Sequence, residues 1–160
     1  MYGITGAVVV AIAAGTVGAV IYQNANDPAK AAVSSFGVAA ADAQCQAVVQ
    51  DPTSGVSDHV GPGTSSPDTT QVDYETVPPS SGPHYAVPVY PNLAFYGERD
   101  APRVEQLVHN LEHGYTILWY DPALPESDQD QVRDLASNIR ATTPKFIAAP
   151  WDSGRGELAD

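Results

Sequence analysis

The first 22 residues constrain this chain most, because they contain no Asp, Glu, Lys or Arg. Residues 3–22 read GITGAVVVAIAAGTVGAVIY, in which Thr5 and Thr16 are the polar residues before the closing tyrosine. A helix of that length rises about 30 Å, the thickness of the hydrocarbon core of a bilayer. A cleaved signal peptide has a shorter apolar stretch behind a basic head, and this chain has no basic head. The sequence therefore predicts an uncleaved, single-pass transmembrane anchor within residues 1–23.

Small residues recur at four-residue spacing along this predicted helix. The pairs Ala7/Ala11, Ala11/Gly15 and Ala14/Gly18 follow the small-xxx-small pattern that lets two membrane helices approach closely. Two interpretations stay open. The segment packs against helices of other membrane proteins, or its alanines and glycines only fill an anchor.

The chain beyond the anchor divides into two further parts. Residues 24–50 read as a tether followed by a short helix over 36–50, in which Cys45 is expected as a small apolar contact. Residues 51–160 are predicted to form the globular domain. Its first stretch is dense in Pro, Ser, Thr and Gly, which is typical of loops, and alternation predicts one strand over 71–77.

The later part of the domain shows regular patterns. Apolar periodicity predicts a helix over 103–113, ended by Gly114, and a buried strand over 115–120. A second helix over 131–141, with Ser127 as its N-cap, precedes a strand over 145–150. This order predicts the α+β fold class, with one small, loop-rich α/β domain after the single membrane helix.

Charge and sulfur content exclude several functions. Seven Lys and Arg against 19 Asp and Glu give a formal net charge of −12, which argues against nucleic acid as a partner. A single cysteine excludes an internal disulfide and a cysteine-only zinc cluster. The single methionine, Met1, excludes a methionine-rich copper(I) site.

The histidines are the best candidates for chemistry. His109 and His113 stand four residues apart on the predicted helix, so both imidazoles share one face, and Glu112 lies beside them. His59 and His84 lie on turn-rich segments that can fold over the end of that helix. Imidazole and carboxylate ligands suit zinc or copper(II), and Glu105 and Asp58 are further acids within reach. The alternative is a set of structural or solvated histidines, with His113 favouring the helix C-terminus when protonated. The candidate metal ligands are His59, His84, His109, His113 and Glu112.

The string HNLEH at 109–113 also matches the H-x-x-E-H zinc motif of a class of metallopeptidases. In that reading Glu112 is the general base that activates a metal-bound water. Those enzymes need a third ligand, usually an acid far downstream, and they are much larger. Peptidase activity is therefore the weaker alternative.

Several of these motifs are shared with a known family. The chain resembles the DUF3105 family of bacterial, mainly actinobacterial, membrane-anchored proteins of unknown function. The resemblance rests on His59-Val60, Tyr74, the string PPSSGPH at 78–84, Tyr96-Gly97 and the string VHNLEHG at 108–114. It implies a domain outside the cytoplasm, held at the cell membrane, with the histidines and Glu112 in the core of the motifs. It implies no activity.

Three functions are consistent with these observations. The first is an accessory protein, not an enzyme, with a histidine-based zinc or copper(II) site outside the cytoplasm. The second is a structural or assembly subunit of a membrane complex, which acts through its Gly/Ala-rich helix. The third is a metal-dependent hydrolase of the H-x-x-E-H type.

Overall fold

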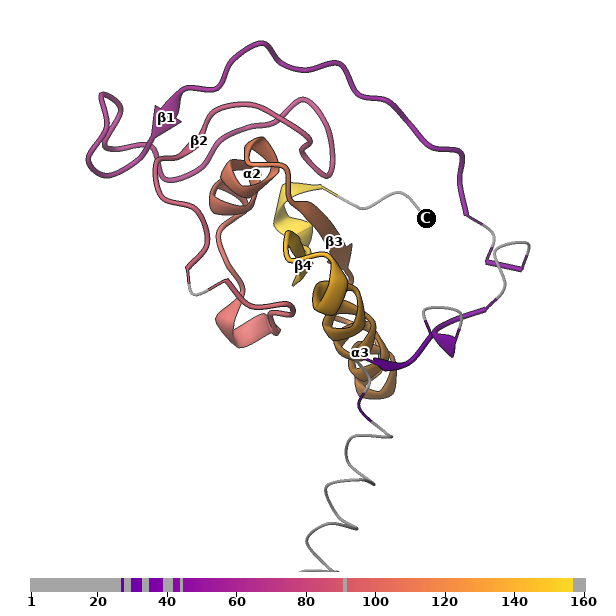
Figure 1. Cartoon of the computed structure of the whole chain (residues 1–160). Helices are drawn as coiled ribbons and strands as arrows, with labels where there is room; N and C mark the ends of the chain where they lie inside the picture. The colour runs from indigo at the N-terminus through magenta and orange to yellow at the C-terminus, as the bar shows by residue number, and fades with distance from the viewer. Residues whose placement is uncertain are drawn as a thin grey trace, which may run out of the picture.

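Figure 1 shows the computed structural model of the chain, which describes residues 27, 30–32, 35–38, 42–43, 45–90 and 92–156. The predicted membrane segment and its small-xxx-small pairs lie outside these residues. Among the residues described, no helix has the length and the apolar character that crossing a bilayer requires.

The described residues form a small mixed α/β domain with two α-helices and short strands. To this extent the predicted fold class is confirmed. The first strands, β1 and β2, pair in parallel, and so do the later strands, β3 and β4. In chain order the elements are β1 (His59–Val60), β2 (His84–Tyr85), the 3-10 turn η3 (Glu98–Asp100), α2 (Val104–Glu112), β3 (Thr116–Tyr120), α3 (Glu126–Thr142), β4 (Phe146–Pro150) and the 3-10 turn η4 (Ser153–Arg155).

The β3–β4 pair lies between the two helices (Figure 1). Side chains alternate across a strand, so Phe146 and Ala148 of β4 face α3, where they meet Ala136. The intervening residues Ile147 and Ala149 face the opposite way and contact Leu107 of α2. Because both faces of β4 are covered, all five of its residues are buried, which explains its unbroken apolar sequence.

Helix α2 forms as its periodicity predicts. Val104, Leu107 and Val108 are buried on the face toward the sheet and the C-terminal segment. The helix ends where Gly114 adopts a φ of +77°, a conformation that glycine accepts without steric cost. The same helix packs against β2, which pairs with β1.

The prediction of a strand over 71–77 is wrong. This stretch makes no ladder and is held instead by side chains. The N–H of Val72 donates to Oε1 of Glu105, at 2.9 Å, and the hydroxyl of Tyr74 donates to the carbonyl oxygen of Pro83, also at 2.9 Å. Glu105 is fully buried and pairs with Arg155 of η4 at 2.9 Å, so one carboxylate fastens this loop and the C-terminal turn to α2.

Three smaller predictions also differ from the structure. The helix expected over 36–50 is absent from 45–50, and Cys45, Val48 and Val49 are exposed there because no apolar surface covers them. Helix α3 begins at Glu126 with Pro125 as its N-cap, so Ser127 lies inside its first turn. The strand expected to be buried, β3, is only partly so, since four of its five residues keep some exposure.

Candidate metal centre

The two small strands bring together histidines that are 25 positions apart in the sequence. In the parallel register of β1 and β2, His59 lies opposite His84. The N–H of His84 donates to the carbonyl oxygen of Asp58, at 3.1 Å, which fixes the two strands side by side.

The loop before His84 is built tightly. Gly82 has a φ of +130°, and a Cβ at this position would come within 3.2 Å of the ring of Tyr74. A larger residue is therefore excluded both by backbone conformation and by space. The hydroxyl of Tyr74 holds the next residue, Pro83, so the SGPH string delivers His84 in one orientation.

The last turn of α2 and its C-cap supply the other two histidines. The ring of His109 stacks on that of His59, with centroids 5.3 Å apart, and meets the ring of His84 edge-on at 4.9 Å. The candidate ligand atoms of these three side chains all lie within 4.8 Å of one another. Two of the three, His84 and His109, are buried, and His59 is exposed.

Backbone carbonyls fix the tautomers of the two buried histidines. Nδ1 of His84 lies 2.8 Å from the carbonyl oxygen of Gly82, and Nδ1 of His109 lies 2.7 Å from that of Tyr85. A carbonyl only accepts hydrogen bonds, so both Nδ1 atoms carry the proton and donate. Each neutral ring then presents the lone pair of Nε2. Such a bond from the second ring nitrogen is the usual means of orienting a metal-binding histidine.

The Nε2 atom of His84 has an unusual neighbour. It lies 3.0 Å from Oε2 of Glu112, yet it is buried and makes no hydrogen bond of normal geometry. With the proton on Nδ1, the lone pair of Nε2 faces a carboxylate oxygen. The two atoms then repel each other unless positive charge lies between them or on one of them. The contact therefore needs a proton between the two atoms or a bound cation.

The fourth histidine, His113, lies at the rim. Its Nε2 is 2.9 Å from Nε2 of His109, its side chain is exposed, and its carbonyl oxygen accepts a hydrogen bond from Lys145 at 2.8 Å. Because His109 offers a lone pair, His113 is the donor in this contact. Burial lowers the pKa of His109, and the neighbouring imidazoles lower it further, which favours the neutral form that binds metals.

The other acids considered from the sequence do not join this group. Glu105 is bound to Val72 and Arg155, so its carboxylate serves the fold. Asp58 contributes a backbone oxygen to His84 and is exposed. Sequence reasoning missed the carbonyls of Gly82 and Tyr85, whose role depends on conformation. Gly82, two residues before His84 in the string at 78–84, was the only available signal.

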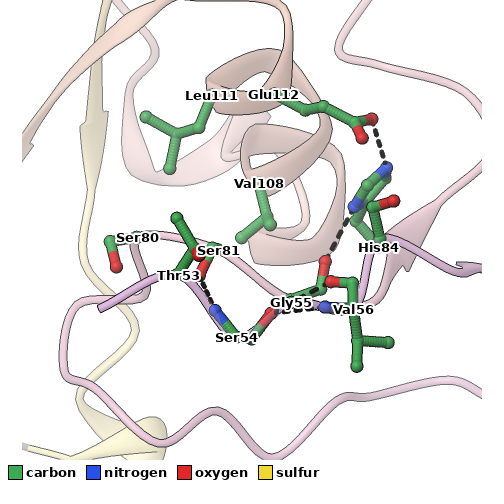
Figure 2. A pocket seen from close by; sticks show the side chains of 12 residues that line it. Thr53, Ser54, Gly55, Val56, Ser80, Ser81, His84, Val108, Leu111 and Glu112 are labelled. Atoms are coloured by element: carbon green, nitrogen blue, oxygen red, sulfur yellow. Dashed lines mark hydrogen bonds and ion pairs between the residues drawn. The ribbon is translucent and has the colours of Figure 1, made fainter. Parts of the chain in front are cut away.

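A cavity of about 430 Å³ adjoins the histidine cluster (Figure 2). His84 and Glu112 meet at one side of it, and Val108 projects from α2 toward the loop that carries Ser54 and Val56. The remaining walls come from the loops at 53–57 and 80–82.

Comparison with known protein families identifies one that matches this chain. Residues 65–155, more than half of the chain, match the family described as "Protein of unknown function (DUF3105)". The chain belongs to the DUF3105 family. The matched segment contains His84, His109, Glu112 and His113, whereas His59 precedes it. No match was found among curated proteins or among solved structures. The predicted family is therefore confirmed, and its description assigns no activity.

Proposed function

We propose that this DUF3105 domain binds one transition-metal ion through His59, His84 and His109, and that it serves as an accessory protein at a membrane. The observation that carries the proposal is the contact between Nε2 of His84 and Oε2 of Glu112. A buried lone pair that faces a carboxylate is costly in the absence of a cation. A divalent ion turns both atoms into ligands.

The donor set supports zinc or copper(II) as the ion. Three imidazoles with a carboxylate nearby suit these borderline ions, and no thiolate or thioether is present among them. Zinc holds nitrogen ligands at about 2.0–2.1 Å, which places them roughly 3.3 Å apart in tetrahedral geometry. The candidate ligand atoms of the three rings lie within 4.8 Å of one another, so small side-chain rotations close the site. Glu112 supplies the fourth ligand, and His113 lies beside the site.

The place of the domain is part of the proposal. We propose that residues 3–22 span the cell membrane once and that the domain lies outside the cytoplasm, as the uncharged segment and the family resemblance suggest. The exposed thiol of Cys45 offers a direct test. A membrane-impermeant maleimide added to intact cells expressing the chain should label Cys45, and a Cys45→Ser chain should stay unlabelled. Labelling only after lysis contradicts this location.

A structural alternative follows from the same contact. Protonation of Nε2 turns His84 and Glu112 into an ion pair that fastens the 80–84 loop to α2 without any metal. The domain would then act as an assembly subunit through its membrane helix. The two functions differ in one measurable property, which is metal content.

The test is elemental mass spectrometry of the full chain, purified in detergent without a histidine tag. We expect near-stoichiometric zinc or copper, retained through gel filtration, and its loss in His84→Gln and His109→Gln chains. Glu75→Gln, a change at an exposed acid away from the site, is the control and should keep the metal. A folded wild-type chain without metal after incubation with zinc excludes the proposed site.

A further inference from the structure

The cavity beside the histidines is lined by apolar and hydroxyl-bearing side chains. We propose that it binds a short, uncharged stretch of polypeptide. The inference deepens the proposed function and rests on it in one respect. Once Glu112 holds a metal ion, the cavity wall has no free carboxylate.

The side chains of the lining offer no partner to an anionic ligand. No Lys or Arg lines the cavity, and its ionisable residues are His84 and Glu112. A phosphate or carboxylate group therefore finds no cationic side chain there, and the net charge of −12 opposes its approach. A cationic ligand would have to compete with the ion for Glu112. An uncharged ligand meets neither obstacle.

The lining offers two kinds of contact at once. Val108 and Leu111 of α2 form an apolar floor, and the facing loops supply hydroxyl groups from residues such as Thr53, Ser57 and Ser80. A volume of about 430 Å³ falls within the usual range of small-ligand sites. A peptide with both termini capped can make both kinds of contact, since it carries an apolar side chain on a backbone of amide groups.

The loop at 53–57 also has free main-chain donors. The N–H of Ser54 donates to Oγ of Ser81, at 3.0 Å, and that of Val56 donates to Oγ of Ser54, at 3.2 Å. The N–H groups of Thr53, Gly55 and Ser57 make no hydrogen bond within the described part of the chain. Peptide carbonyls are natural acceptors for such groups, and this mode of recognition supplies affinity through the main chain.

The experiment is isothermal titration calorimetry of the zinc-loaded full chain with the tripeptide Ac-Ala-Leu-Ala-NH2, which carries no charge. Acetate and inorganic phosphate are titrated in parallel. Leu111→Phe fills the cavity from its floor, and Leu93→Phe makes the same change at an exposed position away from it. Zinc content and circular dichroism are measured for each chain.

We expect the tripeptide to bind the wild type and Leu93→Phe equally, and Leu111→Phe to bind at least about tenfold more weakly, with zinc content unchanged. Acetate and phosphate should bind more weakly than the tripeptide. If Leu111→Phe does not fold, Leu111→Ser removes the same apolar contact and should also weaken binding.

Three results overturn the inference. The first is a zinc-loaded wild type that does not bind the tripeptide. The second is a folded cavity variant that binds it as tightly as the wild type does. The third is tighter binding of acetate or phosphate than of the tripeptide. A chain that lacks zinc but still binds the tripeptide contradicts the metal site instead, so the two proposals fail separately.

Discussion

Nε2 of His109 in α2 and Nε2 of His113, the C-cap of that helix, lie 2.9 Å apart, and only one of them can donate a hydrogen to the other. The carbonyl oxygen of Tyr85 accepts a hydrogen bond from Nδ1–H of His109, which leaves Nε2 of His109 without a proton, so His113 is the donor. A metal bound to Nε2 of His109 must break this hydrogen bond. Metal binding therefore leaves the imidazole of His113 without this hydrogen bond, next to the ion.

The first prediction concerns the unequal roles of these two histidines. His113→Gln should weaken zinc binding about 10- to 100-fold, as expected for a residue that supports the site from its rim. His109→Gln should abolish zinc retention, because it removes one of the three converging rings. Competition with a chromogenic chelator measures both affinities. Equal losses in the two variants contradict the assignment of His113 to the rim.

The second prediction concerns metal removal. Zinc at about 100 times its Kd stabilises a folded protein by about 2.7 kcal/mol if the unfolded chain does not bind it. For a domain of this size, such a change should raise Tm by about 10 °C or more. Thermal unfolding with zinc, and then with excess chelator, measures the shift. His84→Gln should show no zinc-dependent shift, and a wild type that also shows none has no such site.

The helix that carries His109 and His113 was predictable because its cause is local. Four-residue spacing places both rings on one face whatever the rest of the chain does. Strands β3 and β4 were predictable for the same kind of reason, since short apolar runs bounded by turn residues favour strands.

The arrangement around His84 was not predictable in this way. The β1–β2 ladder pairs only two residues on each strand, so no periodic pattern in the sequence predicts it. The position of His84 depends on contacts with Tyr74 and Asp58, and the proton on its ring depends on the carbonyl of Gly82. The prediction of a strand over 71–77 was wrong for a related reason. Its alternating residues are held by the buried carboxylate of Glu105 and not by a strand ladder.

The third prediction distinguishes a bound metal from a protonated histidine. Glu112→Gln replaces a carboxylate by an amide that can donate to the lone pair of His84. The metal-free domain should therefore become more stable by about 1 kcal/mol, while zinc affinity falls. Urea unfolding in chelator measures the first effect and chelator competition the second, with Glu75→Gln as the neutral control. A less stable metal-free Glu112→Gln domain points to an ion pair with protonated His84.

The last prediction concerns Tyr74, which positions the loop of His84. Burial raises the pKa of its hydroxyl, and the nearby carboxylate of Glu105 raises it further. An unfolded tyrosine loses its proton near pH 10, so above that pH the unfolded chain binds fewer protons than the folded one. Stability is thus fully present below about pH 10 and is lost as the pH rises toward the folded-state pKa.

Tyr74→Phe should reduce this alkaline loss without removing it, because the hydroxyls of Tyr96 and Tyr120 also have raised pKa values. At neutral pH the same change should cost about 1–3 kcal/mol, since the carbonyl of Pro83 loses its donor. Urea unfolding at pH 8 and at pH values above 10 measures both effects, with the exposed Tyr90→Phe as the control. A Tyr74→Phe chain with the wild-type alkaline profile shows that this hydroxyl does not link the loop's stability to pH.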